Sequence, residues 1–478
     1  MTNPRAVSQP TAPATAGAGT GGGGLRRSLG FTDLVLITVG TVIGSGIFLV
    51  PSVVLRQTGL DPRLALLVWT AAGILSLLGA LTYAELGAMR PDAGGLYVYI
   101  RDAFGPLTAF LYGWTSFFVI ASGSMATLAV AFSGYLSQLV PLGPVGAKLV
   151  SIGVIAVTAA VNIAGTRKGA TVQNWTTGAK VLTLVSLSGA LMALGHHSGA
   201  ALFAPAVNGG NGIAPRIGAA MIGVLWAYEG WQYVTFCAGE TRDPQRVFPR
   251  AITIATLGLI VIYLLANIGY MTALGVPAAA ASDHVAVDAV RELVGPAAGA
   301  IVGTLILVSI FSATNGLMLT APRMYYAMAR DGVFFERLAV VSPRTGTPAF
   351  AITAIAVWSA LLAVSGTFEQ LLTYVVFTGW VFYALGGASV IVLRRKSPHA
   401  IRPFRVPGYP VTPILFVASA GWLVVDTILT QPARAAVGLG TVLIGTPAFY
   451  LWRARSMRGA AASPLAPAPE KRDASAAS

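Results

Sequence analysis

Two charged side chains interrupt apolar segments of the chain. Lys180 lies near the middle of a stretch at 169–193, and Glu229 lies within another at 217–239. A charge at the centre of a membrane-spanning helix costs at least about 2.5 to 3.5 kcal/mol unless it has a partner. Both residues are therefore candidates for binding or transport chemistry.

The ammonium group of Lys180 could contact backbone carbonyl groups and take the place of a bound cation. The alternative is a lysine whose side chain reaches the membrane surface, which is harder from mid-span. A protein that uses lysine in the first way would not need sodium.

Glu229 is open to three interpretations. Its carboxylate could balance a substrate ammonium, on the backbone or on a cationic side chain. It could accept a proton, or it could be a structural carboxyl bonded to nearby amides.

Two motifs place glycine and polar residues inside apolar segments, GTVIGSGIF at 40–48 and LWAYEGWQY at 225–233. Glycine costs about 1 kcal/mol in a helix interior, so each motif is a candidate helix break. Close packing of helices through small residues is the alternative. A break exposes amides on one half-helix and carbonyls on the other, which suits a ligand that carries both charges.

An amino acid fits this pattern. Its carboxylate would meet the amides near Ser45 and Gly46. Its ammonium would meet carbonyls near Val42, Trp226 and Glu229, for which sodium ions are alternative ligands. Among the aromatic residues of the second motif, Trp226 is the candidate for lining a pocket because it borders the break. The candidate substrate site comprises Val42, Ile43, Gly44, Ser45, Gly46, Trp226, Ala227, Glu229 and Gly230.

The composition indicates what surrounds these residues. Of 478 residues, 55% are hydrophobic and 10% are charged, whereas a soluble domain averages about 25% charged. Together with a mean hydropathy of +0.72, this predicts a membrane protein. Apolar runs of this length without alternation predict helices rather than barrel strands. Twelve spans are predicted, at 34–55, 64–84, 103–147 (with a turn at 141–144), 149–166, 169–193, 217–239, 251–282, 293–322, 345–368, 370–393, 406–425 and 435–452.

The basic residues indicate the orientation of these spans. Of 31 Lys and Arg residues, 24 fall on the side of the two termini, six fall on the other side and Lys180 lies within a span. This predicts a multi-pass protein of the plasma or inner membrane with both termini in the cytoplasm. The tails at 1–27 and 454–478 are expected to be disordered. Acidic residues at span ends are expected to be caps or partners of inner-face arginines: Asp33, Glu85, Glu240 and Asp426.

Several function classes are excluded by the same residues. The net charge of +14 is spread between apolar runs and does not form the basic face of a nucleic-acid-binding protein. Cys237 is the single cysteine, so the sequence predicts no disulfide framework. The four histidines lack ligand spacing, and no phosphate loop or nucleophile motif occurs. We expect neither an enzyme nor a bound cofactor or metal.

Six motifs in order resemble the amino acid-polyamine-organocation superfamily, and within it the L-type amino acid transporter family. The similarity extends from about residue 28 to 453. Its motifs are GTVIGSGIF, YAELGAMRPDAGGLYVYIRDAFGP, TTGAK, LWAYEGW with GETRDPQRVFPRAI, TNGLMLTAPR and ARDG.

This resemblance implies an all-α, leucine-transporter-type fold of twelve transmembrane helices, with helices 1 and 6 broken. Two inverted repeats would span 28–195 and 214–396, followed by the last two helices at 406–453. The two breaks begin 185 residues apart, in spans 1 and 6, as such a repeat predicts.

The resemblance also implies roles for site residues. Lys180 matches the family lysine that occupies the sodium position of sodium-coupled relatives, with Ser312 as its partner on span 8. Trp226 would act as an aromatic gate. The acidic Glu229 is similar to members that accept cationic amino acids. The loop at 137–148 lacks the cysteine through which animal members join a glycoprotein subunit, so no disulfide-linked heavy subunit is expected.

The function hypothesis is a sodium-independent amino acid transporter that works by alternating access, as an exchanger, and accepts cationic amino acids. A proton-coupled amino acid or polyamine permease is the alternative. A channel or an amino acid sensor on the same scaffold is a further alternative.

Overall fold

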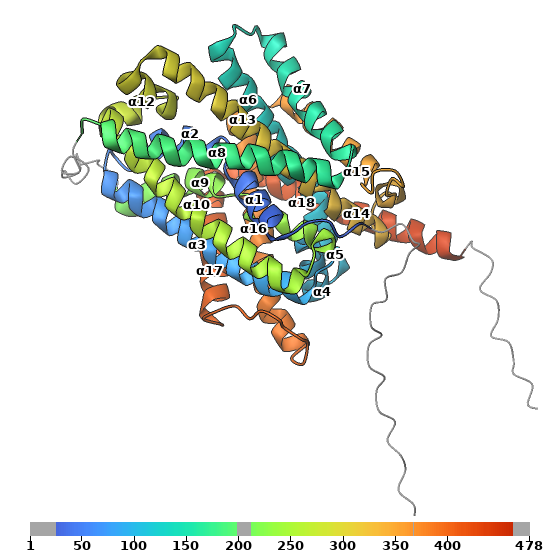
Figure 1. The fold of residues 1–478 in the computed structure, drawn as a ribbon. Helices are drawn as coiled ribbons and strands as arrows, with labels where there is room; N and C mark the ends of the chain where they lie inside the picture. Colours follow the sequence, from blue (N-terminus) through green and yellow to red (C-terminus); the bar gives the residue numbers. More distant parts are fainter. Residues whose placement is uncertain (1–24, 198–211, 367, 462–478) are drawn as a thin grey trace, which may run out of the picture.

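The computed structural model describes residues 25–197, 212–366 and 368–461, and most of the two predicted tails lies outside them. Figure 1 shows a bundle of helices, and the described residues contain no strand beyond an isolated bridge between Leu29 and Thr241. The predicted all-α fold is confirmed.

Each predicted span corresponds to one or more helices. Spans 1 to 6 are formed by α1 (Phe31–Val42) with α2 (Gly46–Gln57), α3 (Pro62–Met89), α5 (Pro106–Thr115) with the π-helix η1 (Ser116–Ile120) and α6 (Ala121–Leu139), α7 (Pro144–Ile163), α8 (Thr166–Leu194), and α9 (Ile213–Ala227) with the 3-10 helix η3 (Trp231–Glu240). Spans 7 to 12 are formed by α10 (Pro244–Leu274), α13 (Pro296–Thr320), α15 (Ala349–Ser365), α16 (Phe368–Lys396), α17 (Val411–Thr430) and α18 (Pro432–Ala461). Short helices lie between them: α4 (Leu96–Phe104), α11 (Val276–Ala281), α12 (Val285–Val294), α14 (Pro322–Arg330) and η4 (Glu336–Ala339).

Length and composition agree with a membrane protein. Among the described residues, nine helices are long and apolar enough to cross a bilayer, and the bent pair α1 and α2 makes a tenth. The remaining two predicted spans are α15, which is shorter, and α9 with η3, which is interrupted. Span 7 ends sooner than predicted, at Leu274, because the apolar residues that follow form the separate helix α11.

Local sequence explains where several helices begin. Proline occupies the first turn of α3, α5, α7, α10 and α13. Proline lacks a backbone N–H, and this costs nothing there because the first N–H groups of a helix have no acceptor within the helix. The Asp61 side chain also caps α3 by accepting hydrogen bonds from the backbone amides of Arg63 and Leu64.

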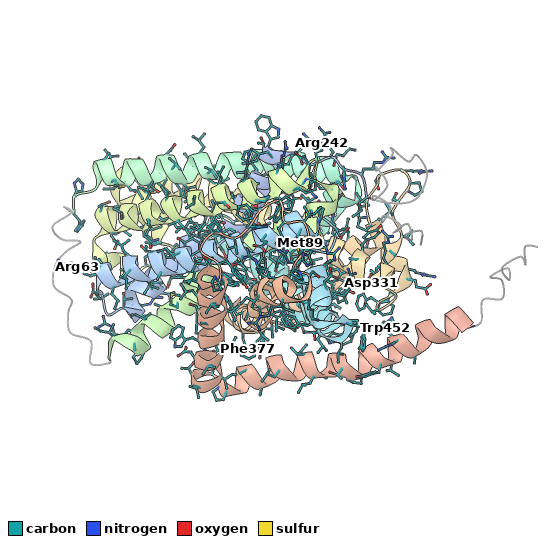
Figure 2. All side chains as sticks on the ribbon, turned by 90° about the horizontal axis from the view of Figure 1, so that it is seen from below. Arg63, Met89, Arg242, Asp331, Phe377 and Trp452 are labelled. Carbon is teal, nitrogen blue, oxygen red and sulfur yellow. The ribbon has the colours of Figure 1, made fainter. Side chains whose placement is uncertain are left out.

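The acidic residues at span ends behave largely as predicted. Asp33 pairs with Arg167 at 2.9 Å, and its carboxylate also accepts the amide of Gly30. Glu85 pairs with Arg394 at 2.6 Å, and the buried Glu240 pairs with Arg323 at 2.7 Å. Asp426 instead lies beside Gly218 of α9. Figure 2 shows Arg63, from a predicted outer loop, and Asp331, from a predicted inner one, at opposite ends of the bundle.

The two broken spans lie at the centre of the bundle. Helix α1 packs against α8, α10 and α13, and α2 packs against α9 (Figure 1). The fold therefore surrounds both breaks with helices from distant parts of the chain.

Candidate functional site

The first break separates α1 from α2. Helix α1 ends at Val42, α2 begins at Gly46, and the two axes differ by 44°. Because α2 starts at Gly46, the amides of its first turn have no carbonyl acceptor within the helix. The predicted break in span 1 is confirmed.

The second break follows Ala227, where α9 ends, and the chain resumes as η3 at Trp231. Gly230 has a φ of +131°, a conformation that residues with a side chain rarely adopt. A Cβ atom there would also lie 2.7 Å from the backbone carbon of Thr41. The predicted break in span 6 is confirmed, and glycine is required where it meets α1.

The two breaks contact each other directly. A Cβ atom on Gly46 would lie 2.7 Å from the Cα atom of Ala227, so a side chain at Gly46 would separate them. The Thr41 hydroxyl donates to the carbonyl of Gly230 at 3.1 Å. The Tyr263 hydroxyl of α10 lies 3.2 Å from the carbonyl oxygen of Val42 and 2.8 Å from that of Ala227. Backbone groups from both breaks thus face one small region.

That region contains a cavity of about 20 Å³, room for roughly one water molecule. An amino acid is larger, so the cavity has to widen for one to enter. The residues that line it are Thr41, Val42, Gly44, Ser45, Gly46, Ser124, Leu128, Trp226, Glu229, Gly230, Tyr233 and Leu317.

Seven of the nine predicted substrate-site residues line this cavity, and Ile43 and Ala227 do not. Ile43 turns its carbonyl toward Lys180, and Ala227 packs against Gly46. Sequence reasoning missed the other five lining residues, which are Thr41 of α1, Ser124 and Leu128 of α6, Tyr233 of η3 and Leu317 of α13. None of them stands out locally, because residues of these types occur throughout the apolar segments.

Three polar atoms of cavity-lining residues lack partners among the described residues. The hydroxyls of Ser45 and Tyr233 and the Oε2 atom of Glu229 are buried without a hydrogen bond. Burying such atoms costs free energy of folding unless a ligand or a water molecule forms a hydrogen bond with them. The cavity therefore offers unsatisfied groups at both breaks, Ser45 in the first and Glu229 in the second.

Lys180 lies in the middle of α8 and is 2% exposed. Its Nζ atom donates to the carbonyl oxygens of Gly40 at 2.7 Å and Ile43 at 2.6 Å, both from the end of α1. A third contact, at 3.3 Å, is the carbonyl oxygen of Ser309 in α13. The ammonium group thus occupies a cluster of carbonyl oxygens of the kind that binds a cation.

The residue of α13 that contacts Lys180 is Ser309 rather than the predicted Ser312. The Ser309 hydroxyl reaches the carbonyl oxygens of Ile43 at 3.3 Å and Gly44 at 3.4 Å. Ser312 lies one turn further along and contacts the hydroxyls of Thr176 at 2.9 Å and Thr177 at 3.3 Å.

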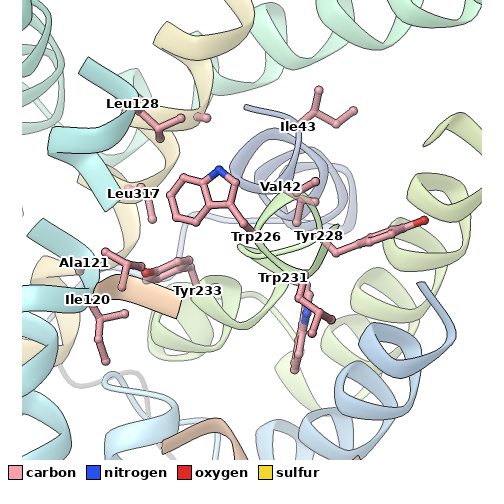
Figure 3. Packing of buried hydrophobic residues seen from close by; sticks show 14 of the residues in the cluster. Val42, Ile43, Ile120, Ala121, Leu128, Trp226, Tyr228, Trp231, Tyr233 and Leu317 are labelled. Atoms are coloured by element: carbon pink, nitrogen blue, oxygen red, sulfur yellow. The ribbon is translucent and has the colours of Figure 1, made fainter. Parts of the chain in front are cut away.

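The aromatic residues of the second break divide into two groups. In Figure 3 the Trp226 ring points toward Leu128 and Leu317, whereas Tyr228 and Trp231 point away from it. Tyr228 packs against Tyr263 and Trp69, and Trp231 packs against Tyr83 and Phe416. Only Trp226 of these three lines the cavity.

Comparison with known proteins places the chain in a family. The family model described as "Amino acid permease" matches residues 29–449. The chain is 30% identical to the serine/threonine exchanger SteT of Bacillus subtilis, over 89% of this chain and 97% of that protein. It is 33% identical to the human large neutral amino acids transporter small subunit 2, over 91% and 82% of the two chains. It is also 33% identical to the b(0,+)-type amino acid transporter 1 of Rattus norvegicus, over 86% and 84%.

These matches cover nearly all of the helical bundle, including both breaks and Lys180. They agree with the resemblance found in the motifs, and the relatives are transporters rather than enzymes. The chain therefore belongs to the amino acid permease family and is a multi-pass membrane protein.

Proposed function

We propose that this protein is a sodium-independent amino acid exchanger that works by alternating access. The observation that carries the proposal is the position of Lys180, whose ammonium group contacts three carbonyl oxygens next to the first break. A fixed positive charge there removes the need for a sodium ion to stabilise the same carbonyls. The relatives named for amino acid transport and exchange support the substrate class.

In this proposal the substrate binds across the two breaks. Its carboxylate accepts hydrogen bonds from the amides of Ser45 and Gly46 and from the Ser45 hydroxyl, which lacks a partner. Its ammonium group contacts the carbonyl oxygens of Val42, Trp226 and Glu229. Trp226 covers the bound substrate as an aromatic gate.

The side chain of the substrate meets Glu229. The unpartnered Oε2 atom at the cavity supports a cationic amino acid as one accepted substrate. A buried carboxylate opposite a substrate ammonium or guanidinium forms a charge-assisted pair. A proton-coupled permease is the second candidate, because the same buried carboxyl could carry a proton instead.

Alternating access requires two halves that move relative to each other. We assign α1 to α8 and α9 to α16 as inverted repeats at 28–195 and 214–396, with α17 and α18 at 406–453 outside them. Both termini are cytoplasmic and the protein lies in the plasma or inner membrane, on the basis of the basic residues. It works without a disulfide-linked heavy subunit, because its single cysteine, Cys237, is buried.

Reconstituted vesicles distinguish these functions. Purified protein in liposomes preloaded with unlabelled amino acid should take up external labelled amino acid several times faster than in empty liposomes. Uptake that ignores internal amino acid but collapses with an uncoupler of the proton gradient would favour the proton-coupled permease. Saturable binding without flux would favour a sensor, and single-channel conductance would favour a channel.

A further inference from the structure

A chain of hydrogen bonds runs behind the cavity and ends on Glu229. The amide of Gly230 donates to Oε1 of Gln232 at 3.1 Å, and Nε2 of Gln232 donates to the Tyr383 hydroxyl at 2.8 Å. That hydroxyl donates to Oε1 of Glu229 at 2.8 Å. Gln232 and Tyr383 are both buried, and neither lines the cavity.

The direction of this chain is fixed by its first member. A backbone N–H can only donate, so the Gln232 atom that faces Gly230 must be the amide oxygen. The other end of the Gln232 amide is then the NH₂ group, which can only donate to Tyr383. The hydroxyl proton of Tyr383 then points to Glu229, and Oε1 of Glu229 accepts it.

The position of Tyr383 is itself fixed from outside the site. The Tyr83 hydroxyl of α3 donates to the backbone carbonyl of Tyr383 at 3.0 Å, and Tyr383 also packs against Trp380. The hydroxyl that reaches Glu229 thus comes from a part of α16 that α3 holds in place.

One carboxyl oxygen remains for the substrate. Oε1 of Glu229 is occupied by Tyr383, whereas Oε2 is buried, unpartnered and part of a cavity-lining residue. We propose that Gln232 and Tyr383 are positioning residues that aim this one oxygen at the substrate and so select side chains that donate a hydrogen bond. This inference rests on the proposed function, because it assigns substrate selection to the same site.

The chemical class of the preferred substrate follows from the Oε2 atom of Glu229, which is a hydrogen-bond acceptor. Ammonium, guanidinium and hydroxyl side chains can donate to Oε2, whereas alkyl side chains of equal size leave it unsatisfied. Lysine against 2-aminoheptanoate and serine against 2-aminobutyrate are matched pairs that differ in this donor. The protein should prefer the donor-bearing member of at least one pair by about tenfold in apparent KM.

The test is a double-mutant cycle on exchange in liposomes. Tyr383→Phe and Glu229→Gln should each reduce the preference for the donor-bearing substrate by about fivefold or more. If Tyr383 acts through Glu229, adding Tyr383→Phe to Glu229→Gln should change the preference by less than twofold. Tyr99→Phe is the matched control, because its buried hydroxyl has no hydrogen-bond partner among the described residues.

Exchange of the alkyl substrate serves as the internal reference for folding. The exchange rate of the donor-bearing substrate is divided by that of the alkyl substrate for each variant, so that a general loss of folded protein cancels, and Gln232→Met should reproduce the effect of Tyr383→Phe if Tyr383 proves intolerant of change. Equal preference within both substrate pairs, or additive losses in the cycle, would overturn the inference while leaving amino acid exchange intact. Absence of exchange by the wild-type protein for every amino acid would contradict the proposed function instead.

Discussion

The Nζ atom of Lys180 lies 2.6 Å from the carbonyl oxygen of Ile43, the residue that follows the end of α1. This contact joins α8 to the point where the first span unwinds. The carbonyl of Ile43 has lost its place in the helix ladder, and a charged donor satisfies it within the bundle. Lys180 therefore stabilises the broken helix, in addition to the cation-replacing role that we propose for it.

Lys180→Met removes the ammonium group but keeps a side chain of similar volume, so its effect reports the hydrogen bonds rather than the packing. Three carbonyl oxygens lose their shared donor, so we expect exchange to fall by at least tenfold and the unfolding temperature in detergent to decrease. Lys148→Met, at an exposed position, is the control and should change neither quantity. Full activity of Lys180→Met would show that the broken helix does not depend on the ammonium group.

Gly46→Ala should push the two breaks apart. The added Cβ atom would meet backbone and side-chain atoms of Ala227 at 2.7 to 2.8 Å, and relieving such overpacking costs about 1 to 3 kcal/mol. Exchange should be strongly impaired even where the protein remains folded and monodisperse. Gly134→Ala, whose new methyl group would have no neighbour within 4 Å, should retain wild-type exchange. Equal exchange by the two variants would argue against close contact of the breaks.

Trp226 and Trp231 should respond differently to truncation. Trp226→Ala removes a cavity wall, so apparent KM should rise by about tenfold with a small loss of stability. Trp231→Ala leaves a void beside Tyr83 and Phe416 and should cost about 3 to 5 kcal/mol of stability. Kinetics and thermal unfolding of both variants measure the difference, and the reverse assignment of effects would refute the orientation seen in Figure 3.

Arg323 and Glu240 form a fully buried ion pair, with side chains 0% and 1% exposed. The Thr166 hydroxyl completes it by donating to Glu240 and accepting from Arg323, each at 2.9 Å. Arg323→Met leaves the carboxylate buried and unpaired, which should destabilise the protein by about 3 to 5 kcal/mol.

The partly exposed pair of Arg101 and Asp331 provides the comparison. Arg101→Met removes this pair and a second one with Asp102, and it should cost no more than about 1 kcal/mol, because solvent screens both pairs. Thermal unfolding of the two variants side by side measures this difference. Similar losses would mean that burial does not determine the contribution of these ion pairs.

Much of the architecture could be predicted from the sequence, because the bilayer restricts spanning segments to long apolar helices. The breaks at Gly46 and Gly230 were also predictable, since glycine and polar residues rarely share the centre of a span without a reason. Lys180 and Glu229 were found by the cost of burying a charge. The division into inverted repeats stays a prediction.

The contacts between spans could not be predicted in the same way. Ser309 and Ser312 lie three residues apart on one face of α13, so the sequence alone does not tell which one faces Lys180. Tyr263 and Tyr383 reach the breaks from α10 and α16. The sequence around a tyrosine in a membrane helix does not show that its hydroxyl contacts a distant break. These contacts depend on the rotation of each helix, which packing of the whole bundle determines.

Counterflow without sodium shows whether exchange depends on Lys180 rather than on a sodium ion. Liposomes that contain the wild-type protein and a high concentration of unlabelled amino acid are diluted into labelled amino acid, once in sodium chloride and once in choline chloride. If Lys180 occupies the position of a sodium ion, the initial rate of labelled uptake is the same in both media, and it is at least tenfold lower for Lys180→Met in either. Uptake by the wild-type protein that requires sodium would contradict this role of Lys180.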